Sequence, residues 1–84
     1  MRVNIKLLGW MREFLADGIA HFDDQDFELP AGFTLADLIA KFGFASESPF
    51  MVMCNGNRVL DAAFAVTSLE EGDQILFVPP LKGG

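Results

Sequence analysis

The chain has 84 residues, which is enough for one domain with one hydrophobic core. Hydrophobic residues make up 51% of it, including nine Phe, so the composition is that of a folded chain. The single Cys excludes an internal disulfide and a Cys-ligated metal site within one chain. A formal net charge of -6 disfavours binding to nucleic acid or to anionic membrane surfaces.

The same features indicate where the chain works. No apolar run is long enough to span a bilayer, and the N-terminal residues alternate instead of forming the apolar block of a signal peptide. We therefore expect a cytoplasmic protein. The acidic charge allows a basic protein partner, although solubility alone is a sufficient reason for it.

Residues 2–8 are predicted to form the first strand, because apolar and polar residues alternate there. A short helix or helical turn is expected over residues 10–16, where apolar residues recur at helical spacing. A second strand is expected over residues 26–29, with Phe27 and Leu29 facing the core.

The main helix is predicted over residues 35–42. Thr34 is a good N-cap, Asp37 stands where the acid of a capping box belongs, and Gly43 suits the left-handed position after the last turn. One apolar stripe at helical spacing faces the core, formed by Leu35, Leu38, Ile39 and Phe42.

The second half of the chain is predicted to contain three strands. A loop over residues 45–49 leads into a continuous apolar run at 50–54, which is the first of these strands. An Asn-Gly-Asn turn at 55–57 connects it to a short return strand at 58–60, and the last strand follows at 74–78. One helix across a mixed sheet of about four to five strands is an α+β arrangement. The element order is compatible with a β-grasp fold.

We find no catalytic constellation within the domain. There is no phosphate-binding loop motif. His21, the one histidine, lies beside acids and is expected at the solvated surface, and Cys54 is expected to be a small buried hydrophobe. The acids Asp23, Asp24 and Asp26 lack the Gly and distal Glu of a calcium loop. We therefore predict no bound metal, no bound cofactor and no independent enzyme.

The C-terminus is the unusual feature. A strand ends at Pro79-Pro80, which cannot extend a hydrogen-bonded ladder, and Leu81 and Lys82 then precede a terminal Gly83-Gly84. Two residues without side chains can thread a channel too narrow for any Cβ. The terminal carboxylate is a poor electrophile and needs activation by another protein, because this chain shows no nucleotide site. A disordered or truncated terminus is the alternative interpretation.

In these features the sequence resembles the ubiquitin-like sulfur carriers, a family that includes the small subunit of molybdopterin synthase and the thiazole-synthesis carrier. The resemblance rests on residues 69–84, with the Gly72-Asp73 turn, the last strand and the terminal Gly-Gly. The Asn55-Gly56 turn, the Thr34-led helix and the first strand support it. The Pro-Pro pair favours the molybdopterin branch.

The resemblance implies a β-grasp domain over residues 1–80 and a flexible tail over 81–84. It implies that a ubiquitin-activating-type adenylyltransferase uses ATP to adenylate Gly84, which is then converted to a thiocarboxylate, with Gly83 as its threading neighbour. The implied docking stretch contains Phe77, Val78, Pro79, Pro80, Leu81 and Lys82, and strand alternation leaves either Phe77 or Val78 exposed, but not both.

The implied sulfur acceptor is the molybdopterin synthase large subunit or a thiazole synthase. Lys82 departs from the molybdopterin branch, where small hydroxyl or neutral residues are common. A cation is unfavourable inside a basic channel, so Lys82 weighs against the molybdopterin synthase large subunit as the partner. A carrier for thiamin thiazole or another pathway therefore stays open. So does a ubiquitin-like protein modifier or interaction module.

Overall fold

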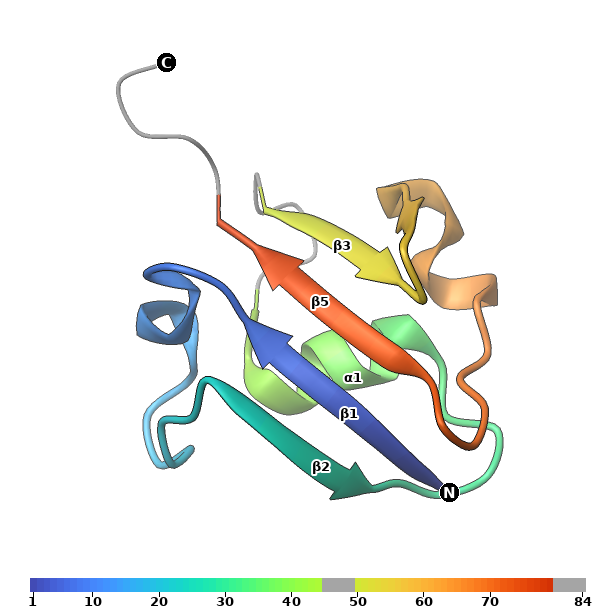
Figure 1. Cartoon of the computed structure of the whole chain (residues 1–84), viewed down its shortest axis with the longest axis horizontal. Coiled ribbons are helices and arrows are strands. Elements are labelled where there is room, and N and C mark those ends of the chain that lie inside the picture. The colour runs from blue at the N-terminus through green and yellow to red at the C-terminus, as the bar shows by residue number, and fades with distance from the viewer. Residues whose placement is uncertain (45–49, 80–84) are drawn as a thin grey trace.

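The computed structural model describes residues 1–44 and 50–79. Within them, five strands form one mixed sheet in the order β2-β1-β5-β3-β4 (Figure 1). β5 runs parallel to β1 and antiparallel to β3, and the outer pairs are antiparallel. The strands are β1 (Arg2–Leu7), β2 (Asp24–Glu28), β3 (Met51–Cys54), β4 (Asn57–Val59) and β5 (Gln74–Val78). The loop predicted over 45–49 lies outside the described residues.

The main helix, α1 (Leu35–Phe42), has the predicted bounds and the predicted caps. Thr34 Oγ1 accepts a hydrogen bond from the Asp37 N–H at 3.1 Å, and Asp37 Oδ2 accepts one from the Thr34 N–H at 3.0 Å. Gly43 ends the helix in the left-handed conformation, with a φ of 81°. These local contacts satisfy end groups that the helix itself cannot pair, so the sequence sets both ends.

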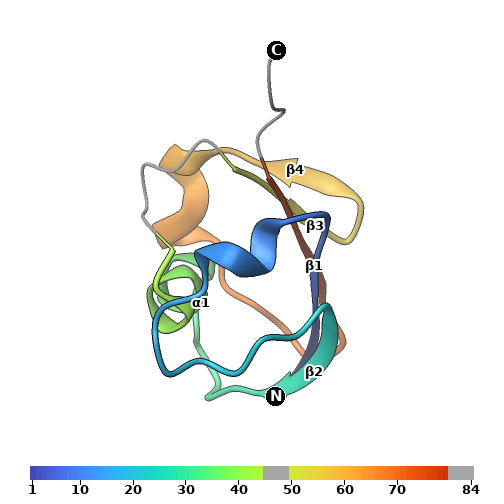
Figure 2. The ribbon, with the colours of Figure 1, turned by 90° about the vertical axis from the view of Figure 1, so that its left-hand side faces the viewer.

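The core lies between α1 and one face of the sheet, which Figure 2 shows nearly edge-on with α1 to one side. Alternate residues of the central strands and the apolar stripe of α1 are buried together, as the two periodicities predict. The buried set on these elements comprises Val3, Ile5, Leu7, Val52, Ile75, Phe77, Leu35, Leu38, Ile39 and Phe42.

Several element bounds differ from those predicted. The first helical segment is a 3-10 helix, η1 (Met11–Phe14), and a second one, η2 (Asp61–Val66), was not predicted. β2 begins two residues earlier than predicted and ends before Leu29, which is buried all the same. Phe27 is only half-buried and packs at the edge of the core against Phe42, with ring centroids 5.3 Å apart.

A polar clasp joins the β3–β4 turn to the start of β5. Asp73 is nearly buried, and its two carboxylate oxygens accept hydrogen bonds from Asn55 Nδ2 at 2.9 Å and from the Glu70 N–H at 2.8 Å. Asn55 Oδ1 accepts from the Gln74 N–H at 2.9 Å. Asn55 holds a φ of 52°, which its short polar side chain tolerates. The clasp therefore fixes where β5 enters the sheet.

Asp73→Ala is expected to lower the free energy of unfolding by about 2–3 kcal/mol, because two hydrogen bonds to a carboxylate are lost. Chemical denaturation measures this change. Asp17→Ala is the matched control, since Asp17 is exposed and forms no ion pair within the described residues. Equal stability of the two variants would show that the clasp contributes nothing.

Candidate functional site at the end of the last strand

Strand β5 is held on both sides up to the point where it leaves the sheet. Phe77 pairs with Leu7 of β1, and Val78 pairs with Met51 of β3. The Leu8 N–H then donates to the Phe77 carbonyl at 3.0 Å. The last hydrogen bonds of β5 therefore come immediately before Pro79, and the chain beyond begins at a fixed place on the domain (Figure 1).

Phe77 anchors this end of β5 in the core. Its side chain is fully buried, and its ring lies within 5.1 Å of Phe44, 5.9 Å of Phe50 and 6.4 Å of Phe42, centroid to centroid. Val78, on the opposite face, is half-buried, as the alternation along a strand predicts. The Phe77 side chain is therefore not presented for docking, and we transfer the predicted docking role of this strand to Val78 and its neighbours.

Exposed apolar side chains lie on the segment that follows β1, which begins beside the exit of β5. Leu8 is 45% exposed, and Phe14 of η1 is 39% exposed with its ring edge-to-face against Trp10 at 5.3 Å. Between them, Gly9 lies against Pro79, so closely that a Cβ on Gly9 would lie 3.4 Å from the Pro79 ring. We call this surface the exit patch, and it consists of Leu8, Trp10, Phe14, Val78 and Pro79.

The exit patch was not predicted, because the spacing of Trp10 and Phe14 indicates only a helical turn. The signal was the second leucine of Leu7-Leu8, which breaks the alternation of β1 and places an apolar side chain on the open side of the sheet. The remaining predicted site residues, Pro80, Leu81, Lys82, Gly83 and Gly84, lie outside the described residues, and their roles remain predictions.

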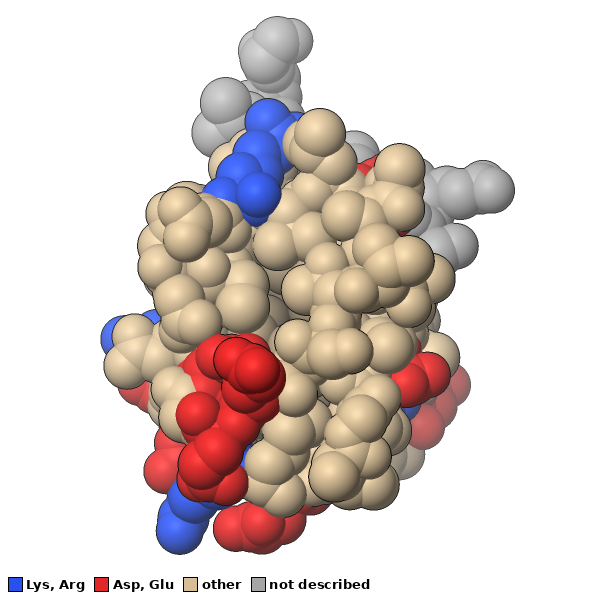
Figure 3. All heavy atoms as spheres, turned by 90° about the vertical axis from the view of Figure 1, so that its right-hand side faces the viewer, with Lys and Arg blue, Asp and Glu red and all other residues tan. Residues whose placement is uncertain are grey.

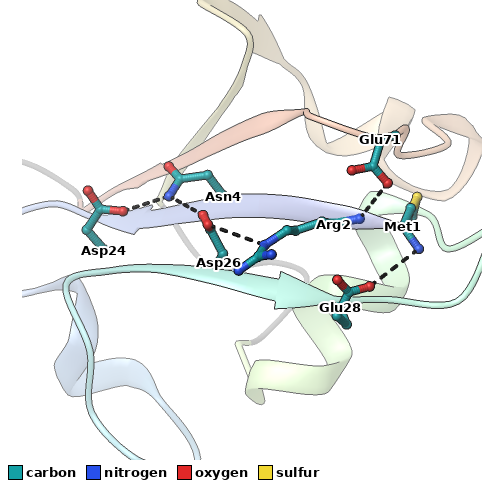
Figure 4. A network of polar contacts seen from close by, with 7 residues as sticks. All are labelled: Met1, Arg2, Asn4, Asp24, Asp26, Glu28 and Glu71. Carbon is teal, nitrogen blue, oxygen red and sulfur yellow. Dashed lines mark hydrogen bonds and ion pairs between the residues drawn. The ribbon is translucent and has the colours of Figure 1, made fainter.

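The acids of β2 are engaged with β1 rather than with a shared ion. Figure 4 shows Asn4 Nδ2 donating to Asp24 and Asp26, at 2.7 and 3.0 Å, and Arg2 paired with Asp26 at 3.5 Å. Arg12 pairs with Asp23 at 3.1 Å. Within residues 1–44 and 50–79, no group of His, Cys, Asp and Glu could hold a metal ion. Charged side chains on this edge strand also oppose pairing with a further strand.

Two other candidate residues lack the setting that chemistry would need. His21 is exposed, as predicted. Cys54 is half-buried, more accessible than predicted, but burial raises the pKa of its thiol and the carboxylates of Asp73 and Glu70 raise it further. A smaller fraction of the thiol is therefore ionised at neutral pH than in an ordinary cysteine, which lowers its reactivity. None of the helices in the described ranges is long and apolar enough to cross a membrane.

Comparison with solved structures identifies the fold as the ubiquitin-like β-grasp, as predicted. SAMP1 from Haloferax volcanii has a TM-score of 0.67 at 16% identity, with all of both chains covered. The thiamine biosynthesis protein ThiS from Geobacter metallireducens has 0.62 at 18% identity, covering 96% of this chain and 99% of that one. A putative molybdopterin converting factor subunit 1 from Pyrococcus furiosus has a TM-score of 0.65 at 22% identity, covering 95% of this chain and 98% of that one.

The ThiS family model matches residues 5–84, so the chain belongs to the ThiS family. This confirms the resemblance to the ubiquitin-like sulfur carriers that the terminal residues indicate. Members of the family are small carrier proteins rather than catalysts, and they work with adenylyltransferases and sulfur-accepting enzymes. The search of curated proteins gave no match.

The raised pKa of the Cys54 thiol predicts that this cysteine reacts slowly with alkylating reagents. Alkylation by iodoacetamide at neutral pH is expected to be slower than that of a free cysteine, because less thiolate is present. The rate, followed by mass spectrometry across a pH series, should rise with a midpoint above the ordinary thiol value. A midpoint below that value would identify Cys54 as an activated thiol and contradict the structural role.

Proposed function

We propose that this protein is a sulfur carrier whose Gly84 is adenylated by a partner enzyme and converted to a thiocarboxylate, and that the chain itself catalyses no step. The observation that carries the proposal is membership of the ThiS family over residues 5–84, which include the terminal Gly83-Gly84. The anchored end of β5 supports it, because the domain then serves to present a tail to larger enzymes.

The chemistry follows from the terminal carboxylate. Its oxygen attacks the α-phosphate of ATP in the adenylyltransferase, and pyrophosphate leaves. A persulfide sulfur then attacks the Gly84 carbonyl and AMP leaves, which gives an acyl disulfide. A second thiol of the partner enzymes attacks the former persulfide cysteine, forms a disulfide with it and releases the thiocarboxylate, which is a better nucleophile than the carboxylate. ATP and the persulfide belong to the partner enzymes, and this carrier acts in the cytoplasm.

We further propose that the exit patch is where a partner enzyme docks while it receives the tail. Leu8 exposes apolar surface beside the point where β5 ends, and Phe14 exposes more on η1, the next element along the chain. Covering that surface removes water from apolar groups and places the chain beyond Pro79 at the partner's active site. Pro79, Pro80, Leu81 and Lys82 extend this contact along the tail, with Gly83 in the narrowest part of the channel.

The preferred pathway is molybdopterin biosynthesis, in which this chain would be the small subunit of molybdopterin synthase and the large subunit its sulfur acceptor. The Pro79-Pro80 pair supports that choice, while Lys82 weighs against it. The alternative is a carrier for thiamin thiazole, with thiazole synthase as the acceptor, or for another pathway. Sulfur transfer from the purified thiocarboxylate to each acceptor enzyme in turn discriminates these pathways.

Co-expression with the cognate adenylyltransferase and a sulfur donor is expected to replace one oxygen of the chain by sulfur, as measured by intact-mass spectrometry. Deletion of Gly84 should abolish this product, because the terminal carboxylate of the shortened tail no longer reaches the α-phosphate of ATP. His21→Ala is the control, since His21 is exposed and is not part of the exit patch, and it should give the full product. An unmodified wild-type carboxylate under conditions that modify another carrier would contradict the proposal.

Phe14→Lys is expected to weaken binding to the adenylyltransferase by about tenfold or more, because a charge would be buried in an apolar contact. Isothermal titration calorimetry measures the affinity. Val66→Lys is the matched control, since Val66 is equally apolar, more exposed and located on η2. Loss of affinity in the Val66 variant instead would place the docking surface on η2 rather than at the exit patch.

A protein modifier is the second candidate, and the similarity of the fold to SAMP1, a small archaeal modifier protein, supports it. A modifier forms an isopeptide bond between Gly84 and a lysine of its target, whereas a carrier returns to the free carboxylate after transfer. Anti-tag immunoblots of cells that carry a tagged chain distinguish the two, because only the modifier gives covalent conjugates that survive reduction and boiling.

A further inference from the structure

A second apolar surface lies on the α1 and η2 side of the domain, and the function proposed above does not use it. A groove of about 340 Å³ runs between the two helices. The Leu35 N–H donates to the Thr67 carbonyl at 2.9 Å, which holds the end of η2 against the start of α1. The groove is open because alanines line much of it, and its lining consists of Ala36, Ile39, Asp61, Ala62, Phe64 and Ala65.

Apolar side chains protrude at both ends of η2. Val66 is 79% exposed and Leu60 is 61% exposed, which makes them the most exposed large hydrophobic residues in the described ranges. Figure 3 looks onto this side of the molecule, and most of the surface in view carries neither basic nor acidic side chains. Val66 directly follows Ala65, which lines the groove, so the recess and a protruding side chain are next to each other at the end of η2.

That combination fits a second copy of this chain. In a two-fold arrangement each copy offers the other the same surface, so Val66 of each copy can enter the groove of the other. Two chains of net charge -6 repel one another, and the repulsion is least where an uncharged face meets an uncharged face. A basic partner would instead be drawn to acidic surface, and Asp61 is the one charged residue that lines this groove.

We propose that the α1–η2 groove is a self-association surface, with Val66 of one copy inserted into the groove of the other in a two-fold dimer. η2 lies on the opposite side of the domain from η1 and the end of β5 in Figure 1. Both exit patches therefore remain accessible in the dimer. The proposal does not depend on the sulfur-carrier function, and each can fail without the other.

Sedimentation velocity over a concentration series tests the proposal with the full chain. The wild type is expected to show a sedimentation coefficient that rises with concentration. Val66→Lys should raise the dimer dissociation constant at least about tenfold, since it would bury a charge in an apolar groove. Phe14→Lys is the matched control, with the same change in charge at the other apolar surface, and should leave the constant unchanged.

A second pair of variants tests the recess. Ala65→Lys fills the groove and should weaken the dimer, whereas Ala20→Lys, an equal substitution at an exposed position of the η1–β2 connection, should not. All four substituted positions are exposed, and circular dichroism confirms that each variant is folded. Added salt is expected to strengthen the wild-type dimer, because it screens the repulsion between the acidic chains.

Three results would overturn the proposal. One is a wild type that stays monomeric at every concentration. Another is a dimer that Phe14→Lys dissociates and Val66→Lys does not, which would place the interface at the exit patch. The third is an association that salt weakens, because ion pairs rather than apolar contact would then hold the two copies together.

Discussion

The pairing of β5 on both of its edges is the constraint on which the rest of the structure depends. β5 lies between β1 and β3, so the first and last strands of the chain are neighbours in the middle of the sheet. Phe77 fixes β5 from the core side, and the Asn55–Asp73 clasp fixes its start from the polar side. The residues that follow this strand therefore start from a fixed place on the domain, which is what a carrier or a modifier needs.

The predictable part of the fold is the part that local chemistry decides. Thr34, Asp37 and Gly43 set the ends of α1 within a few residues of sequence, and both ends are correct. The alternation over β5 predicted that Phe77 and Val78 are not both exposed, and the structure shows Phe77 buried and Val78 half-buried. In both cases the deciding interactions join residues that are close together in the sequence.

The parts that the sequence did not predict depend on contacts between distant residues. η2 carries apolar residues without a cap that marks its start, and its position is set by the hydrogen bond between Leu35 and Thr67. The Asn55–Asp73 clasp joins two turns that were each recognised separately, 18 residues apart. The exit patch likewise forms only because β1 and β5 lie side by side, which periodicity within one segment cannot reveal.

The parallel pairing of β1 with β5 also has a consequence for biosynthesis. A chain that ends before Gln74 leaves β1 and β3 each with an unpaired edge and leaves Phe42, Phe44 and Phe50 without the ring that they surround. Because long-range pairing of this kind forms late, the sheet closes only after nearly the whole chain has been made. Incomplete chains would stay unfolded and open to proteolysis, so the protein that reaches its partner enzymes carries an intact β5.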